Sequence, residues 1–432
     1  GTGPKGQRLL FTDSTPGASD ILYQLEYYTS TSSWAVIPNV DLTGNMTGTS
    51  TSPLDISNLS RITYNQIRLV ANLACASGIC PSLNDWTIEW SDGITISGTA
   101  KQYDETTNVT SGTVAVAVNG VLQAGKTGTI SGGAWSIGHV TAFAGDIITV
   151  FVDGAADSSE AVGMTLYDGT GDITGMQLFE RHVALGSVDI PTLTNANLSQ
   201  YDNSISGDED IFFEVDAGND FAACALAECT DVKLYIASST TYRPDSTSGG
   251  NVATHDLVLN GYFTADGNTI TASGSWDNNG TFTKDTSTVI LTATSTTETI
   301  DGTGATTTTF YNLTLGQTSG AATWSLSSAL DVDGTLNVTY GTLAQNGNRA
   351  INVASNMTIG ASGLFTKGTA TTTFDGTGSS TFPDNTVSKQ DMGIVTVDGS
   401  TKTLLLGAAS KMTDVTIGAD DILSVNNNYA LE

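Results

Sequence analysis

The second half of the chain repeats itself. Residues 274–284 (GSWDNNGTFTK) recur in outline as residues 357–367 (MTIGASGLFTK), and residues 288–291 (TVIL) recur at the same offset as residues 371–374 (TTTF). Repeats of this kind stack supersecondary units that cannot bury their apolar faces alone, so they build extended bodies rather than a globule around one pocket. Such a body typically spans, supports or presents something else.

The local pattern of the chain indicates strands. Apolar residues alternate in residues 113–118 (TVAVAV), 147–152 (IITVFV) and 331–338 (DVDGTLNV), and no long window keeps a helical rhythm. The 47 glycines and the many Thr, Ser and Asn residues are typical of short strands joined by tight turns. We therefore predict an all-β protein.

A chain of 432 residues is too long for one ordinary core, which predicts several domains. We expect residues 1–92 to form a jelly-roll-like β-sandwich and residues 93–160 an Ig-like β-sandwich. Residues 161–254 are acidic and are predicted to be a connecting β region. Residues 255–432 hold repeats of about 82 residues, the last cut in its middle. This cut suggests that a longer polypeptide or another copy completes the open end.

Two architectures fit the repeats. Thr and Asn recur at matching positions, where side-chain ladders form between the stacked coils of a parallel β-helix, each coil having roughly 20 residues. Tandem Ig-like sandwiches would also fit the period. We favour the β-helix, and we predict N-terminal β-sandwich domains followed by a repetitive solenoid.

The charge of the chain limits its partners. A formal net charge of -29 disfavours nucleic acid, because phosphate contacts need clustered Lys and Arg. Only 14% of the residues are charged, so the surface is expected to consist mostly of Thr, Ser and Asn, as suits an extracellular body. No apolar stretch is long enough to span a bilayer.

The four cysteines form two local pairs with the same spacing, Cys75 with Cys80 and Cys224 with Cys229. Each pair can close a small loop as a disulfide, and Gly78 lies in a suitable turn of the first loop. Zinc is the competing interpretation, but zinc sites favour closer spacing with a second pair or histidines nearby. Two local disulfides imply an oxidising location.

Acidic loops are candidate cation sites. Asp168 and Asp172 lie in a glycine-rich loop, and Asp208 and Asp210 lie in a second acidic segment. Their carboxylates are hard oxygen ligands, which predicts structural Ca²⁺ as the one cofactor to consider. Neither segment has the spacing of a known calcium loop, so solvated acidic loops are the alternative.

Trp34, Trp86 and Trp90 are candidates for glycan binding in the first domain, because exposed aromatic rings can form a platform for sugars. The alternative is that these rings fill the core of the sandwich. No catalytic residues are predicted, because His139, His182 and His255 lie far apart and no nucleophile elbow is present.

The repeats carry a resemblance in residues 276–282 (WDNNGTF), 310–315 (FYNLTL) and 330–336 (LDVDGTL), and it extends upstream to residues 167–172 (YDGTGD) and 200–204 (QYDNS). In these motifs the chain resembles the large repetitive secreted surface proteins of the candidate phyla radiation (Patescibacteria) and related environmental bacteria. The resemblance implies a secreted protein that is adhesive or forms an envelope, and it carries no catalytic residues to transfer.

These observations predict an extracellular structural protein of the bacterial surface, not an enzyme. It would be a segment of a filament, stalk or surface layer that assembles with other copies through β-strand edges or repeat ends. The alternatives are an adhesin that binds surface glycans and, less favoured, a β-helix carbohydrate-active enzyme.

Overall fold

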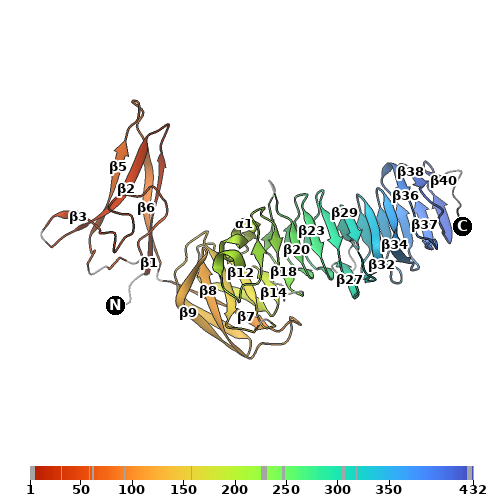
Figure 1. The fold of residues 1–432 in the computed structure, drawn as a ribbon, viewed down its shortest axis with the longest axis horizontal. Coiled ribbons are helices and arrows are strands. Elements are labelled where there is room, and N and C mark those ends of the chain that lie inside the picture. The colour runs from red at the N-terminus through yellow and green to blue at the C-terminus, as the bar shows by residue number, and fades with distance from the viewer. Residues whose placement is uncertain are drawn as a thin grey trace. The chain divides into compact units, whose positions relative to one another are not determined.

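The computed structural model describes residues 5–30, 32–57, 59–60, 63–91, 93–156, 158–224, 231–245, 249–302, 307–317, 319–425 and 431, and the side chains of residues 5–7, 90 and 91 are not part of that description. The fold is almost entirely β-structure (Figure 1), as predicted. The chain divides into two compact units, residues 1–95 with 138–143, and residues 96–137 with 144–432. None of the helices that the structure describes is long and apolar enough to cross a membrane.

The first unit contains two antiparallel three-stranded sheets. One sheet has the order β4 (Leu54–Asp55), β1 (Lys5–Ser14), β6 (Ser82–Ser91), and the other has the order β3 (Trp34–Val36), β2 (Asp20–Tyr28), β5 (Ile67–Ala74). Alternate residues of β2, namely Ile21, Tyr23 and Leu25, are buried with Leu9 and Phe11 of β1 in one core. The period of two along β2 is that of a strand with one buried face.

The second unit begins with strands that pair mainly antiparallel, although residues 96–101 pair in parallel with residues 173–179. They are β7 (Ile94–Lys101), β8 (Ser111–Val118), β9 (Val121–Ser131), β10 (Ala134–Val140), β11 (Ile147–Asp153), β12 (Val162–Leu166) and β13 (Ile173–Phe179). β8 pairs with β9 and β11, and β11 pairs with β12. Asn119 and Gly120 form the hairpin turn between β8 and β9, and both have positive φ.

These strands continue directly into a solenoid, which differs from the independent Ig-like domain predicted for residues 93–160. β12 pairs in parallel with β14 (His182–Leu185), and Ala115 of β8 and Phe151 of β11 share one hydrophobic core with the coils that follow. Because the apolar side of β8 and β11 packs on this core, the antiparallel strands cover the first coil.

The solenoid has about 11 turns and three faces of parallel strands. Face A contains β14, β18 (Lys233–Ile236), β21 (Leu257–Leu259), β24 (Trp276–Asn278), β27 (Thr297–Gly302), β30 (Thr323–Leu326) and the second halves of β32 (Leu336–Ala344) and β34 (Met357–Thr366). Face B contains β17 (Phe221–Ala222), β20 (Val252–Thr254), β23 (Thr269–Ala272), β26 (Thr288–Leu291), β29 (Asn312–Leu315) and the first halves of β32 and β34.

Face C contains one sheet of β15 (Thr192–Leu193), β19 (Thr241–Tyr242), β22 (Tyr262–Thr264) and β25 (Thr281–Thr283). A second sheet on this face contains β28 (Thr308–Phe310), β31 (Leu330–Val332), β33 (Ile351–Val353), β35 (Thr371–Phe374), β37 (Ile394–Val397) and β39 (Asp414–Ile417). Face B continues as β36 (Thr377–Phe382), β38 (Ser400–Leu406) and β40 (Ile422–Val425). The successive coils are seen side by side from green to blue in Figure 1.

The single coil, rather than the longer offset seen in the sequence, is the structural repeat. Register partners on face B run from Ile270 through Val289, Leu313 and Leu336 to Met357, so successive partners lie about 20 residues apart. This confirms the parallel β-helix and excludes tandem Ig-like domains for these residues. Val289 lies on face B, whereas its sequence match Thr372 lies on face C. All three faces are built from the same unit, a strand followed by a tight corner. The similarity between residues 288–291 and 371–374 reflects this shared unit.

Parallel pairing starts well before residue 255. β14 already pairs with β18, and β18 pairs with β21, so much of the predicted connecting region 161–254 consists of coils. Between the first coils lie α1 (Asn195–Leu198), η1 (Ser199–Tyr201), α2 (Asn203–Ser206) and β16 (Glu214–Val215). The acidic side chains of this region lie mainly in corners and turns, where they do not interrupt the buried stack.

Candidate functional site

A cluster of charged side chains joins the loop between β7 and β8 to the first coils. Glu105 lies in that loop, His182 begins β14 and Lys233 begins β18. The Glu105 Oε1 atom lies 3.3 Å from His182 Nε2 and 3.3 Å from Lys233 Nζ. His182 is fully buried, and its Nδ1 lies 2.7 Å from the carbonyl oxygen of Glu180. The loop is therefore held by one carboxylate that contacts two neighbouring coils.

The cluster extends toward the next corner of the solenoid. Lys233 Nζ lies 3.7 Å from Asp256 Oδ2, and Asp256 Oδ1 lies 2.9 Å from His255 Nδ1. Burial alone would raise the pKa of Asp256, but the contact with His255, a hydrogen bond from the backbone of Ser275 and the charge of Lys233 together outweigh burial and lower it. The contact with Asp256 in turn raises the pKa of His255. Acidic and basic groups thus alternate along the cluster.

Two further polar pairs lie on face A, and the second consists of two carboxylates. Ser275 Oγ donates a hydrogen bond of 2.7 Å to Glu298, which is almost completely buried. Asp277 and Asp301 are register partners on neighbouring coils. Burial, followed by repulsion from Asp301, raises the pKa of Asp277. Side by side carboxylates resemble an acid and base pair.

A groove of about 560 Å³ lies beside His255. Small or hydroxyl-bearing side chains line most of it, including Ala253, Thr254, Thr271 and Ser273. It offers hydroxyl groups and one imidazole. Within the described residues, no group of three or more His, Cys, Asp or Glu side chains could hold a metal ion. The cluster and groove therefore bring together paired charges and polar side chains.

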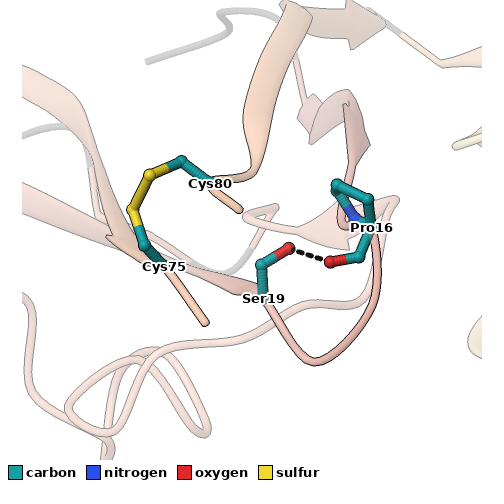
Figure 2. The surroundings of a disulfide bond; sticks show 4 residues. All are labelled: Pro16, Ser19, Cys75 and Cys80. Atoms are coloured by element: carbon teal, nitrogen blue, oxygen red, sulfur yellow. Dashed lines mark hydrogen bonds between the residues drawn. A yellow bond between two sulfur atoms is a disulfide. The ribbon is translucent and has the colours of Figure 1, made fainter. Parts of the chain in front are cut away.

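The first predicted disulfide is confirmed. Cys75 and Cys80 are bonded and close a small loop, in which Ala76 and Ile79 form an antiparallel bridge (Figure 2). In a neighbouring turn, Ser19 Oγ donates a hydrogen bond of 2.7 Å to the carbonyl oxygen of Pro16. Cys229 lies outside the described residues, so the second predicted pair with Cys224 stays a prediction.

The aspartates predicted to bind calcium lie in two separate places, and Asp168, Asp208 and Asp210 accept hydrogen bonds from backbone amides. Asp168 Oδ1 accepts hydrogen bonds from the backbone and side chain of Thr170, and Asp168 lies with Asp172 beside Tyr167. Asp208 accepts a hydrogen bond from the backbone of Asp210. Such bonds are the ordinary use of Asp in turns.

The second acidic segment also ties a loop to the first coils. The two carboxylate oxygens of Asp210 accept bonds from the backbone of Gly154 and Ala155, at 2.7 and 3.1 Å. Burial raises the pKa of Asp210 despite these bonds. The carboxylate of Asp210 therefore has a role in the fold.

Two of the predicted glycan residues lie in different sheets of the first unit. Trp34 lies on β3, whereas Trp86 lies on β6 in the other sheet of the first unit. The guanidinium of Arg68 lies 4.6 Å from the centre of a Trp34 ring, and Tyr28 contacts the same side chain. Trp86 is 49% exposed. The side chain of Trp90 lies outside the described residues.

Sequence reasoning missed the charged cluster. His182 and His255 lie far apart along the chain, so their positions in the sequence did not predict a common site. In the structure, Lys233 connects them through Glu105 and Asp256. The only local signal was the neighbouring pair His255 and Asp256. The remaining contacts exist because successive coils stack.

No protein-family model, no curated protein and no solved structure matches this chain.

The cluster leads to a prediction. Replacing Glu105 by Gln is expected to lower stability by about 1 to 3 kcal/mol at neutral pH, because a charged acceptor of two buried contacts is lost. Burial raises the pKa of Glu105, but His182 and Lys233 together lower it below its ordinary value. Its contribution is therefore present above the unfolded pKa of about 4.3 and is lost as pH falls through the lower folded value.

Unfolding by denaturant from pH 7 to pH 3, together with chymotrypsin cleavage after Tyr103, measures this effect. Glu209→Gln is the matched control, because Glu209 is exposed. Equal stability and equal cleavage for Glu105→Gln, Glu209→Gln and the unchanged protein would contradict the role given to Glu105.

Proposed function

We propose that this chain is a structural segment of a bacterial cell-surface protein, a stiff β-solenoid that belongs to a filament, stalk or surface layer outside the cell. The proposal rests on the continuous packing of the solenoid, which supports a stiff body. Its rivals are a glycan-binding adhesin and a β-helix enzyme, and the experiments below distinguish all three.

The observation that carries the proposal is the unbroken buried stack along the solenoid. Inward-facing side chains from Ala115 to Met412 belong to one hydrophobic core. Ring centroids in this core lie 5.2 Å apart for Tyr242 and Phe263 and 5.5 Å apart for Phe263 and Phe282. Each coil is thus joined to the next by backbone ladders and by packed side chains, which supports a body that resists bending.

The outer surfaces support the same proposal. Outward positions in register on face C are Thr309, Asp331, Asn352, Thr373, Thr396 and Thr416, which are all small or medium-sized polar residues. A surface of this kind keeps an acidic body with a small share of charged residues soluble, without offering a large apolar patch. The charged cluster is paired within itself, which favours a structural role over catalysis.

Strands β39 and β40 supply the proposed route of assembly. Within the described residues, each pairs with a strand on one side only. Ile417 is 46% exposed although its register partner Val397 is fully buried, and Val425 is 40% exposed although its partner Leu406 is fully buried. Open strand edges next to exposed apolar side chains pair readily with another strand. We infer that this edge joins the protein to a second copy.

Replacing Ile417 by Lys is expected to abolish this association, because a lysine blocks a strand edge and cannot be buried unpaired. Sedimentation velocity over a wide range of protein concentration measures the effect. The unchanged protein is expected to form larger species as concentration rises, and Ile417→Lys is expected to remain a monomer.

The matched control is Val387→Lys, because Val387 is fully exposed in a loop and its replacement should leave association unchanged. An unchanged protein that stays monomeric at every concentration would contradict assembly through this edge. Binding of the first unit to a glycan array would instead favour the adhesin, and release of reducing sugar ends from a polysaccharide would favour the enzyme.

A further inference from the structure

Lys402 is an unusual residue for the interior of a solenoid. It lies in β38 next to Thr401, which has positive φ, and its side chain is completely buried. Its Nζ donates a hydrogen bond of 2.5 Å to the carbonyl oxygen of Ala354, which lies 48 residues earlier in the chain. Ala354 belongs to the corner after β33, two coils away, so the side chain crosses the intervening coil.

The intervening coil contributes Asp375 at the same corner. Asp375 directly follows β35 and precedes Gly376. Its Oδ1 atom is buried, and it has no hydrogen-bond partner among the described residues. A buried carboxylate oxygen without a partner is costly, since it has lost its water and gained nothing in return. This oxygen is therefore a candidate for a chemical change.

Close backbone packing brings the two side chains to one corner. A β-carbon on Gly376 would lie only 2.1 Å from the carbonyl oxygen of Ala354, the same oxygen that Lys402 contacts. A β-carbon on Gly399, one coil further, would lie 2.2 Å from the carbonyl oxygen of Asp375. The corners of three successive coils are thus in contact around the two side chains, which leaves little room for water.

Burial acts on the protonation of both groups. It lowers the pKa of the Lys402 ammonium, although the carboxylates of Asp375 and Asp421 act in the opposite direction. Burial also raises the pKa of the Asp375 carboxyl, although hydrogen bonds from the backbone of Asp375 and Gly376 and the charge of Lys402 act in the opposite direction. Both groups are shifted toward their neutral forms. A neutral amine is a nucleophile and a neutral carboxyl is the reactive acid, whereas the ionised pair does not condense.

We propose that Lys402 and Asp375 form an intramolecular isopeptide bond. The lone pair of the neutral Lys402 Nζ attacks Cγ of the neutral Asp375 carboxyl, after the amine has left the Ala354 carbonyl by rotation of its side chain. A C–N bond forms and a C–O bond breaks. The oxygen leaves as water, with one proton from the carboxyl and one from the amine. Nothing is oxidised or reduced, and no co-reactant is needed.

The bond would join one coil to the next by a covalent link at a corner. The parallel ladders β35 with β37 and β36 with β38 already join the two coils, and Lys402 lies where the second ladder shifts its register. The product is a neutral amide, so one group that cannot ionise replaces two buried ionisable groups. This inference stands on the corner alone and does not depend on the proposed function.

Mass spectrometry of the reduced, purified protein after prolonged incubation tests the proposal. The expected intact mass is one water below the mass of the sequence, and a protease digest is expected to contain one branched peptide that joins Asp375 to Lys402. The Lys402→Met protein should have the full mass of its sequence, with no water lost, and should yield no branched peptide. Asp375→Asn should lose ammonia in place of water, because the side-chain nitrogen of asparagine then leaves as ammonia.

Two results would overturn the proposal. One is an unchanged intact mass together with separate linear peptides that contain Asp375 and Lys402. The other is a loss of water that persists in Lys402→Met, because the sequence Asp375 and Gly376 can also lose water by forming a cyclic imide with its own backbone. If Lys402→Met fails to fold, the digest of the unchanged protein still decides between a branched and a cyclic product.

Discussion

Replacing Trp276 by Ala is expected to destabilise the solenoid by about 3 to 5 kcal/mol, the range found when a large aromatic side chain is removed from a core. Trp276 begins β24 and is fully buried. Its ring centroid lies 4.9 Å from that of Phe282 and 5.1 Å from that of Phe310, so it links faces A and C of the stack. Alanine would leave a cavity that these rigid neighbours cannot fill.

The loss should come from packing alone. Within the described residues, Trp276 Nε1 has no hydrogen-bond partner, so the substitution breaks no hydrogen bond of the indole. Because each coil contacts mainly its neighbours, the damage should be local. Denaturant unfolding measures its size, and hydrogen exchange should show the fastest opening in the coils between residues 257 and 315.

Trp86→Ala is the matched control, because Trp86 is 49% exposed and belongs to the first unit. It should change stability by less than about 1 kcal/mol, as exposed substitutions usually do. Equal unfolding curves for the two variants would show that Trp276 does not hold the stack together.

Replacing Gly280 by Ala is expected to destabilise the protein by about 1 to 3 kcal/mol, although only one methyl group is added. Gly280 forms the corner between β24 on face A and β25 on face C. An added β-carbon would lie 2.1 Å from the carbonyl oxygen of Gly261 in the corner of the preceding coil. Because the neighbouring atom is backbone, the coils must separate or the ladder must shift.

Thermal unfolding of Gly280→Ala and Gly138→Ala provides the comparison. Gly138 has no atom within 4 Å of an added β-carbon, so its replacement is expected to be nearly neutral. A Gly280→Ala protein as stable as the Gly138→Ala protein would contradict the close contact between corners.

The sequence predicted strands more precisely than it predicted their burial. Residues 113–118 and 147–152 alternate or run apolar as strands do, and they lie within β8 and β11. Residues Val114 to Val118 are nevertheless all buried, and so are residues Ile147 to Val152. Both sides of these strands are covered, because one side packs in the core of the solenoid and the other is enclosed by neighbouring strands.

Residues close in sequence were predicted well because their interactions are local. The disulfide of Cys75 with Cys80 depends on a few neighbouring residues. The glycan prediction required side chains from separate strands to meet. Sequence spacing could not show that Asp210 caps Gly154, or that Trp34 packs against Arg68.

By itself, the sequence determined that the chain is built of strands, where many strands end, and that short units of strand and corner repeat. Alternation and corner glycines are local properties, and they survive in any arrangement of the strands. Only the tertiary structure decided which face each strand occupies, how the length of a coil varies along the stack, and which charged groups meet at its corners. The physical reason is that coil register is set by packing between the inward-facing side chains of neighbouring coils. In addition, corner loops differ in length, so similar segments such as residues 288–291 and 371–374 lie on different faces.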